Sequence, residues 1–353
     1  MEGVKALALS SLVMADMRAN TPPSVADVKA IIAGPGGIAE LDAMIDKLEP
    51  DAQRAVLRVA FEARYGCKLD NFSGTDAAGD PSGLVADGAQ DGPNIKKFYQ
   101  LLGDLPSQDV VKSDSMRKFT NIEGGSGSFY SGTKKDVVMR EGDAVLSGAY
   151  KFGEEHEVGK VDPGCEPADQ KEVTFFNWNT SHEVGHAVDD KKKFMAGKVG
   201  DAAFGGWTEH VRNYKPIADA LAAHFKYDAT YIAEYLAHNL NPAMPPVPTG
   251  AGACEPEEWE RRRVAMRAHI DMAGVGNNPW ASMSVATRLA IGGIVYHESY
   301  LNHWSSYKLA ARSQAITGYQ FRAPGEWFSE LYAAFQAKKL KPAHPAYGWL
   351  SAL

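Results

Sequence analysis

The sequence is poor in cysteine, in long apolar runs and in any excess of positive charge. Its three cysteines, Cys67, Cys165 and Cys254, are too far apart for a metal-binding or redox spacing, and free thiols are favoured over a Cys165–Cys254 disulfide. No stretch reaches the roughly 20 apolar residues of a membrane helix. The net charge is -7, with scattered Lys and Arg, so we expect no nucleic-acid partner and no membrane span.

The chain otherwise has the composition of a soluble globular protein. Hydrophobic residues make up 44% and charged residues 23% of its 353 residues, enough for one large domain or two medium ones. The apolar N-terminal stretch carries Glu2 and has only poor cleavage triplets. We therefore expect a packed N-terminal helix and no cleavable signal peptide.

Changes in composition divide the chain into three parts. Residues 1–69 have apolar residues at helical spacing, with Ser24 as an N-cap, and residues 70–94 form a Gly- and Asp-rich linker or mobile loop. Residues 95–353 form the remaining domain, in which 126–152 alternate like short antiparallel strands and 213–275 and 325–338 are helical. The predicted fold class is α+β, mainly helical, with a small antiparallel or mixed sheet.

The motif "HEVGH" at residues 182–186 is the main chemical signal. On a helix, His182 and His186 lie one turn apart on one face and can direct ring nitrogens at one ion. Glu183 projects about 100° away, where a carboxylate can act as a general base on water. The apolar residues around the motif indicate a buried helix. This arrangement favours a zinc hydrolase with Zn2+ as its cofactor.

The third zinc ligand is not next to the motif. The metzincin spacing places Asp189 and Lys192 where Gly and His or Asp are needed, so that pattern fails. A thermolysin-like spacing falls on Gly206, with Glu209 nearby but without the expected surroundings. Asp189 shares the helix face of the histidines, and we interpret it as a group that accepts a hydrogen bond from a ligand histidine.

A stronger candidate lies downstream in "ITGYQFRAPGEWFSELYAAF". Glu326 and Glu330 stand four apart at the start of an amphipathic helix with an apolar stripe that includes Trp327 and Phe328. A carboxylate on the buried side of such a helix needs a partner, and zinc would supply one.

The two blocks "HEVGHAVDD" and Tyr-x6-Glu-x-Phe-x-Glu together resemble the gluzincin-type zinc metalloprotease domain of anthrax lethal factor and related secreted bacterial toxins. The resemblance covers about thirty residues and implies a zincin-like catalytic domain. It implies Glu326 as the third zinc ligand, Glu330 as a supporting residue and Tyr319 facing the substrate carbonyl. The roughly 140 residues between His186 and Glu326 exceed the family's expected separation, so 213–275 would be a helical insertion.

These observations predict a zinc-dependent endopeptidase, a bacterial toxin or secreted effector that acts on a protein or peptide. Two alternatives stay open, namely a zinc amidase acting on cell-wall peptides and a non-catalytic partner-binding protein that retains the zincin fold. A cognate inhibitor or immunity protein is a further expected partner. We expect the protein to be cytoplasmic in the producing cell before it is secreted or delivered into a target cell.

Two further segments carry expectations. A substrate peptide would pair with an edge strand within "TKKDVVMRE", residues 133–141. His297 and His303, in "VYHESYLNHW", are interpreted as structural histidines on different faces of a helix.

Overall fold

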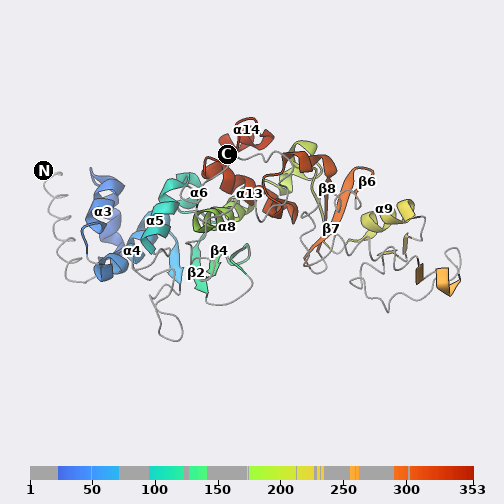
Figure 1. Ribbon diagram of the computed structural model, residues 1–353. Helices are drawn as coiled ribbons and strands as arrows, with labels where there is room; N and C mark the ends of the chain where they lie inside the picture. Colours follow the sequence, from blue (N-terminus) through green and yellow to red (C-terminus); the bar gives the residue numbers. More distant parts are fainter. Residues whose placement is uncertain are drawn as a thin grey trace. The chain divides into compact units, whose positions relative to one another are not determined.

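Helices and small sheets alternate along the chain, which confirms the expected mixed class (Figure 1). The structure is a computed structural model. It describes residues 23–48, 50–70, 95–122, 127–140, 173, 175–211, 213–225, 229–230, 232–233, 255–258, 260–261, 290–300 and 303–353. None of the helices in these ranges is long and apolar enough to cross a membrane.

The chain divides into two compact units. The first comprises Met1–Tyr150 and Asp169–Lys192, and the second comprises Lys151–Ala168 and Lys193–Leu353. The domain boundaries expected at 69 and 94 stay predictions. The N-terminal stretch, Cys165, Cys254 and nearly all of the expected loop 70–94 lie outside the described residues.

The first unit begins with the helices that the apolar spacing predicted, α2 (Val25–Ile32), α3 (Gly37–Ile45) and α4 (Pro50–Tyr65). Ser24 caps α2, as expected. Its Oγ accepts a hydrogen bond from the Asp27 amide, and the Asp27 carboxylate accepts one from the Ser24 amide. This reciprocal pair satisfies amides that the first turn of a helix leaves without partners.

Aromatic rings form the core of this unit. Phe61 of α4 stacks on Phe98 of α5 (Ile95–Asp104), and Phe98 meets Phe119 edge-on at 4.7 Å between ring centroids. All three rings are fully buried. Such edge-to-face and offset contacts stabilise a core beyond the area that they bury. The core therefore joins the N-terminal helices to the first sheet.

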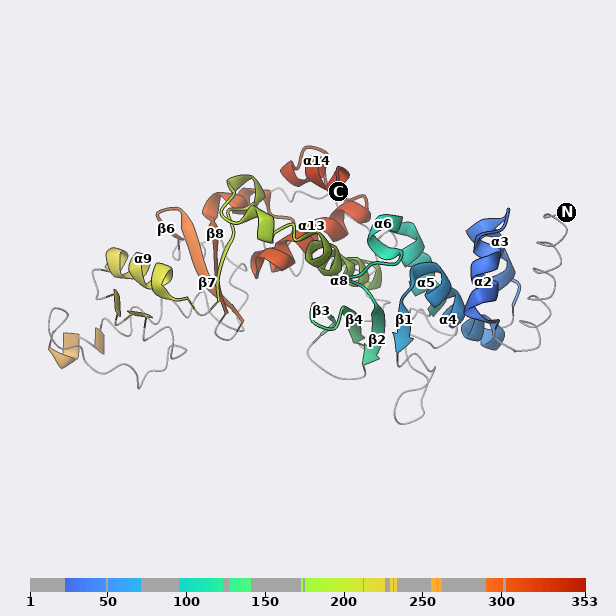
Figure 2. The same ribbon diagram turned by 180° about the vertical axis from the view of Figure 1, so that it is seen from behind.

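That sheet has the strand order β1-β2-β4-β3. β1 (Lys68–Asp70), β2 (Lys118–Ile122) and β4 (Asp136–Arg140) are parallel, and β3 (Phe129–Ser131) pairs antiparallel with β4. Helix α8 (Phe175–Lys192), which carries the HEVGH motif, packs on β3 and β4 (Figure 2). The expected short strands are therefore present next to the motif helix.

The expectation of an edge strand within 133–141 is wrong. β4 occupies most of that segment and pairs over its whole length with β2, while three of its residues also pair with β3. β3 is the terminal strand on that side of the sheet among the described residues. The edge on this side of the described sheet is therefore that of β3, whose Phe129 is 49% exposed.

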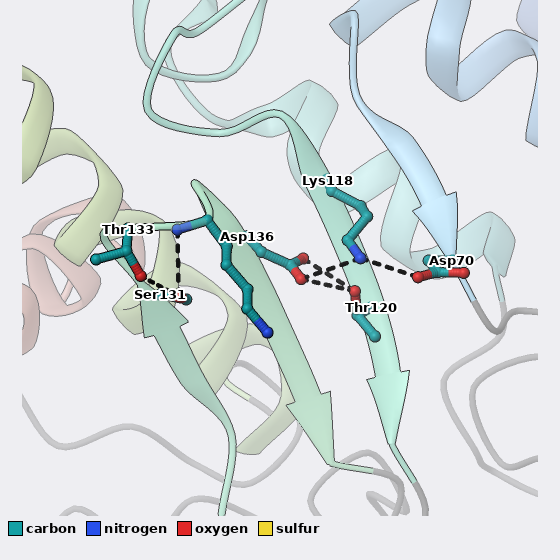
Figure 3. Close-up of polar contacts among 7 residues, drawn as sticks. Asp70, Lys118, Thr120, Ser131, Thr133 and Asp136 are labelled. Carbon is teal, nitrogen blue, oxygen red and sulfur yellow. Dashed lines mark hydrogen bonds and ion pairs between the residues drawn. The ribbon is translucent and has the colours of Figure 1, made fainter.

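A polar network crosses the parallel strands of this sheet (Figure 3). The buried Asp136 carboxylate accepts hydrogen bonds from Thr120 Oγ1 at 2.8 and 3.0 Å and lies 3.4 Å from Lys118 Nζ. Lys118 also contacts Asp70 at 2.9 Å, and this hydrogen bond is the main cause of its raised pKa. A buried carboxylate is tolerated when such donors surround it.

The second unit contains an antiparallel sheet with the order β5-β8-β7-β6. Its strands are β5 (Thr208–Val211), β6 (Ala290–Ile291), β7 (Ile294–Tyr300) and β8 (His303–Lys308). His297 and His303 therefore lie on paired strands, and the expectation of a helix there is wrong. Trp304 of β8 packs with Ile217 and Leu221 of α9 (Lys215–Phe225), a helix within the segment expected to be an insertion.

The same unit ends in α13 (Pro324–Gln336) and α14 (Pro345–Ser351). α13 covers most of the expected helix 325–338 and ends at Gln336, and its Trp327, Phe328 and Leu331 are buried, as the apolar stripe indicated. Trp349 of α14 stacks on Phe328 with ring centroids 5.9 Å apart. Aromatic packing therefore fixes the helix that carries Glu326 and Glu330.

Candidate metal centre

The motif lies where the sequence predicted, in the middle of helix α8. His182 and His186 are one turn apart, their ring centroids are 4.8 Å apart, and their Nε2 atoms are 3.1 Å apart. His182 is buried, with 5% of its surface exposed, and His186 is half-buried. Both imidazoles therefore present the same ring nitrogen to one point.

This separation matches what zinc requires of two ligands. Zinc binds imidazole nitrogens at 2.0–2.1 Å in tetrahedral geometry, which places two such nitrogens about 3.3–3.4 Å apart. The observed 3.1 Å is close to that value. The two histidines fit a zinc ion without a change of backbone, because the i, i+4 spacing of a helix already aligns them.

Glu183 is held on the same helix, next to the first histidine. It is 4% exposed, and the neighbouring Val184 is fully buried. The helix turns by about 100° per residue, so the Glu183 carboxylate leaves the direction of the two imidazoles while remaining beside them. A carboxylate in that position is suited to proton transfer.

The downstream residues Tyr319 and Glu326 are brought together within the second unit. Tyr319 Oη donates to Glu326 Oε1 at 3.4 Å, a long hydrogen bond. The 3₁₀ turn η5 (Tyr319–Phe321) packs against α13 and so closes the six-residue gap between them. Glu326 and Glu330 are 5% and 3% exposed, which confirms the buried carboxylates expected on this helix.

Arg322 is a member of this group that the sequence reading missed. Its Nη1 donates to Tyr319 Oη at 3.3 Å, and its guanidinium carbon lies 5.5 Å from the centre of the Tyr319 ring. Arg322 follows Tyr319 by three residues, so the turn η5 places the two side chains together. A cation beside a phenol hydroxyl and over its ring restrains the tyrosine side chain.

The remaining residues that sequence reading considered lie elsewhere. Glu209, the nearest thermolysin-like candidate, is on β5 and contacts His303 Nε2 at 3.1 Å. His210 contacts Ser306 at 2.8 Å, and burial lowers the pKa of its imidazole. Asp189 is half-buried on α8. Its expected hydrogen bond to a ligand histidine stays a prediction.

Comparisons with protein-family models, with curated proteins and with solved structures gave no match. The functional assignment therefore depends on the residues and their geometry. Within the described residues, the sequence-predicted donors divide into the pair on α8 and the carboxylates on α13.

Proposed function

We propose that the chain is a zinc-dependent endopeptidase with a zincin-like fold of the gluzincin type. His182 and His186 supply two ligands and Glu326 the third. These three residues are the candidate set of metal donors in the described part of the chain. The two histidines belong to the first unit and Glu326 to the second, so the binding of one ion by all three residues is part of the proposal.

The observation that carries this proposal is the His182–His186 geometry. Two imidazoles on one helix turn their Nε2 atoms to within 3.1 Å of each other. Nitrogen and carboxylate oxygen are ligands that zinc prefers, and two histidines with one glutamate are the ligand set of a known class of zinc peptidases. The donor chemistry and the spacing therefore agree.

The bound metal would supply Lewis acidity toward a carbonyl and lower the pKa of water to about 7. Glu183 takes a proton from the water whose oxygen attacks the peptide carbonyl carbon. The carbon–nitrogen bond then breaks, and Glu183 delivers that proton to the departing amine. Peptide hydrolysis is thereby balanced, with one water consumed and a carboxyl and an amine released.

Tyr319 would donate a hydrogen bond to the carbonyl oxygen of the substrate. Its hydroxyl is a hydrogen-bond donor beside Glu326, and a donor aimed at developing negative charge lowers the barrier of acyl transfer. Arg322 holds the tyrosine side chain in place. Glu330 lies one turn after Glu326 on α13 and is equally buried, which suits the supporting role proposed for it.

An extended protein or peptide segment is the proposed substrate, and β3 is the strand that would receive it. β3 has a free edge among the described residues and packs beside α8, and edge strands bind peptides through main-chain hydrogen bonds. The toxin or effector setting that the resemblance implies is proposed together with this activity.

The test combines zinc analysis with proteolysis of a mixed peptide library. Wild type should bind one zinc per chain and cleave peptides, and Glu183→Gln should keep the zinc and lose the cleavage. Glu209→Gln is the matched control, since Glu209 lies on β5 beside His303. Bound zinc without any cleavage that depends on Glu183 would overturn the peptidase assignment.

A further inference from the structure

Side-chain contacts at two positions of helix α8, Asn179 and Asp190, join it to the β3 segment and the turn that follows it. Asn179 Nδ2 donates to Ser128 Oγ at 3.1 Å, just before β3 begins. Tyr130 Oη, in the middle of β3, lies 2.6 Å from Asp190 Oδ2 and 2.8 Å from Ser115 O, so its one proton has two acceptors within reach. Lys135, in the turn between β3 and β4, forms an ion pair with the same carboxylate. All of these residues belong to the first unit.

These two positions lie on either side of the histidine pair. Asn179 precedes His182 by three residues, and Asp190 follows His186 by four. At 100° per residue, positions 179, 182, 186 and 190 fall within about 80° of one another around the helix. The face of α8 that carries the proposed zinc ligands is therefore the same face whose side chains contact the β3 segment.

The contact at Asp190 is partly withdrawn from water. The Asp190 and Lys135 side chains are 17% and 29% exposed, so screening by solvent and salt is weaker than at the surface. Burial, and then the hydrogen bond to Asp190, raise the pKa of Tyr130, which keeps the phenol protonated as a donor. The backbone of Lys135 has φ 54°, and its amide donates to Ser131 O at 2.7 Å. The turn that presents Lys135 is therefore tightly closed.

We propose that Asn179 and Asp190 are positioning residues that hold the free edge of β3 in register along the histidine-bearing face of α8. The proposal deepens the peptidase assignment and rests on it. A peptide paired with β3 would be placed by these contacts relative to Glu183, so they would determine which peptide bond is cleaved. Peptide hydrolysis depends on such placement, because an error of about 1 Å costs on the order of 100-fold in rate.

The test uses Tyr130→Phe, Asn179→Ala and Lys135→Met, with Lys134→Met as the control. Lys134 is exposed in the same turn, so its substitution changes the charge equally without touching Asp190. Amide hydrogen exchange over residues 128–131 should accelerate about 5- to 10-fold in the three variants, the effect of losing one hydrogen bond, and stay unchanged in the control. Lys135→Arg should restore slow exchange. Unchanged exchange in Tyr130→Phe and Asn179→Ala would overturn the proposal.

Kinetics separate positioning from a purely structural role. The variants should keep wild-type zinc affinity, while KM rises, kcat falls for the bond that wild type cleaves, and cleavage spreads to neighbouring peptide bonds. A loss of thermal stability with an unchanged KM and an unchanged cleavage pattern would contradict a positioning role. If wild type cleaves no peptide at all, the peptidase assignment has failed, and the exchange measurement still decides whether the contacts hold β3.

Discussion

The imidazoles of His182 and His186 direct their Nε2 atoms at each other across one turn of helix α8, 3.1 Å apart. Two such nitrogens are compatible either with one shared proton or with one metal ion between them. A zinc ion held by both nitrogens would fit this separation, and the buried carboxylate that follows the first histidine would then lie beside the metal, as proposed above. The predictions below concern first this centre and then the fold that supports it.

Substitution of either histidine should remove the metal. His182→Ala and His186→Ala are each expected to lower the zinc affinity by more than about 100-fold, since even the loss of a residue that only orients a ligand costs 10–100-fold. Competition with a chromogenic chelator measures this directly. His224→Ala, on α9 of the second unit, is the control and should bind zinc as wild type does.

Removal of the Tyr319 hydroxyl should affect turnover and leave the metal in place. Tyr319→Phe is expected to lower kcat about 100-fold or more with unchanged zinc content, because a donor to the carbonyl oxygen acts in the transition state. Arg322→Met should produce a smaller decrease, since Arg322 contacts the hydroxyl at 3.3 Å and acts through it. Steady-state kinetics should show no change for Tyr347→Phe, a half-buried tyrosine on α14.

Part of this site is readable from sequence because its geometry is local. The i, i+4 spacing of His182 and His186 fixes their alignment once the helix forms, and the position of Tyr319 before Glu326 is bridged by a single turn. The sequence did not indicate a role for Arg322, because a single arginine in a turn forms no motif and no periodic pattern. Its role follows only from the contact with Tyr319.

The order of the strands in the first sheet could not be predicted from the sequence. The alternating pattern correctly indicated the strands between residues 127 and 140, but β4 pairs with both β2 and β3 and so lies inside the sheet. Residues 141–152 of that pattern lie outside the described part of the chain. The alternation of apolar and polar residues indicates which side of a sheet each residue faces. An edge strand and an interior strand can show the same alternation. The pairing of Tyr130 with Asp190, 60 residues apart, is likewise a product of tertiary structure.

The stability of the second unit should depend on pH through His344. Its Nδ1 accepts from the Ala346 amide at 3.0 Å and caps α14, and its Nε2 contacts Gln314 O at 2.9 Å, so the neutral imidazole is the form that fits. Burial lowers the pKa of His344 below its usual 6.5. The unfolded chain therefore binds a proton first on acidification, and stability present above pH 6.5 is lost as the pH falls through the lowered pKa.

Denaturant unfolding at several pH values checks this prediction. His344→Asn keeps a capping side chain but does not titrate, so its stability should vary less between pH 7 and pH 5 than that of wild type. His303→Asn, at the start of β8, is the control. Equal pH dependence in wild type and His344→Asn would contradict the assignment.

The buried carboxylate of Asp136 should be more important for stability than its exposed neighbour. Asp136→Ala removes the acceptor of the Thr120 hydroxyl and one partner of Lys118, and should destabilise the protein by about 1–3 kcal/mol. Asp70→Ala removes an exposed ion pair with Lys118 and should change stability by less than about 1 kcal/mol. Thermal or denaturant unfolding of the two variants provides the comparison.

The most direct test of the central claim is a zinc titration of Glu326→Ala. The account predicts one zinc per chain in wild type and a loss of affinity of more than about 100-fold in the variant, with Glu209→Ala titrating as wild type does. Undiminished zinc affinity in Glu326→Ala would show that the two histidines complete their site with another ligand, and Asp189 or Glu209 would then be the residue to replace.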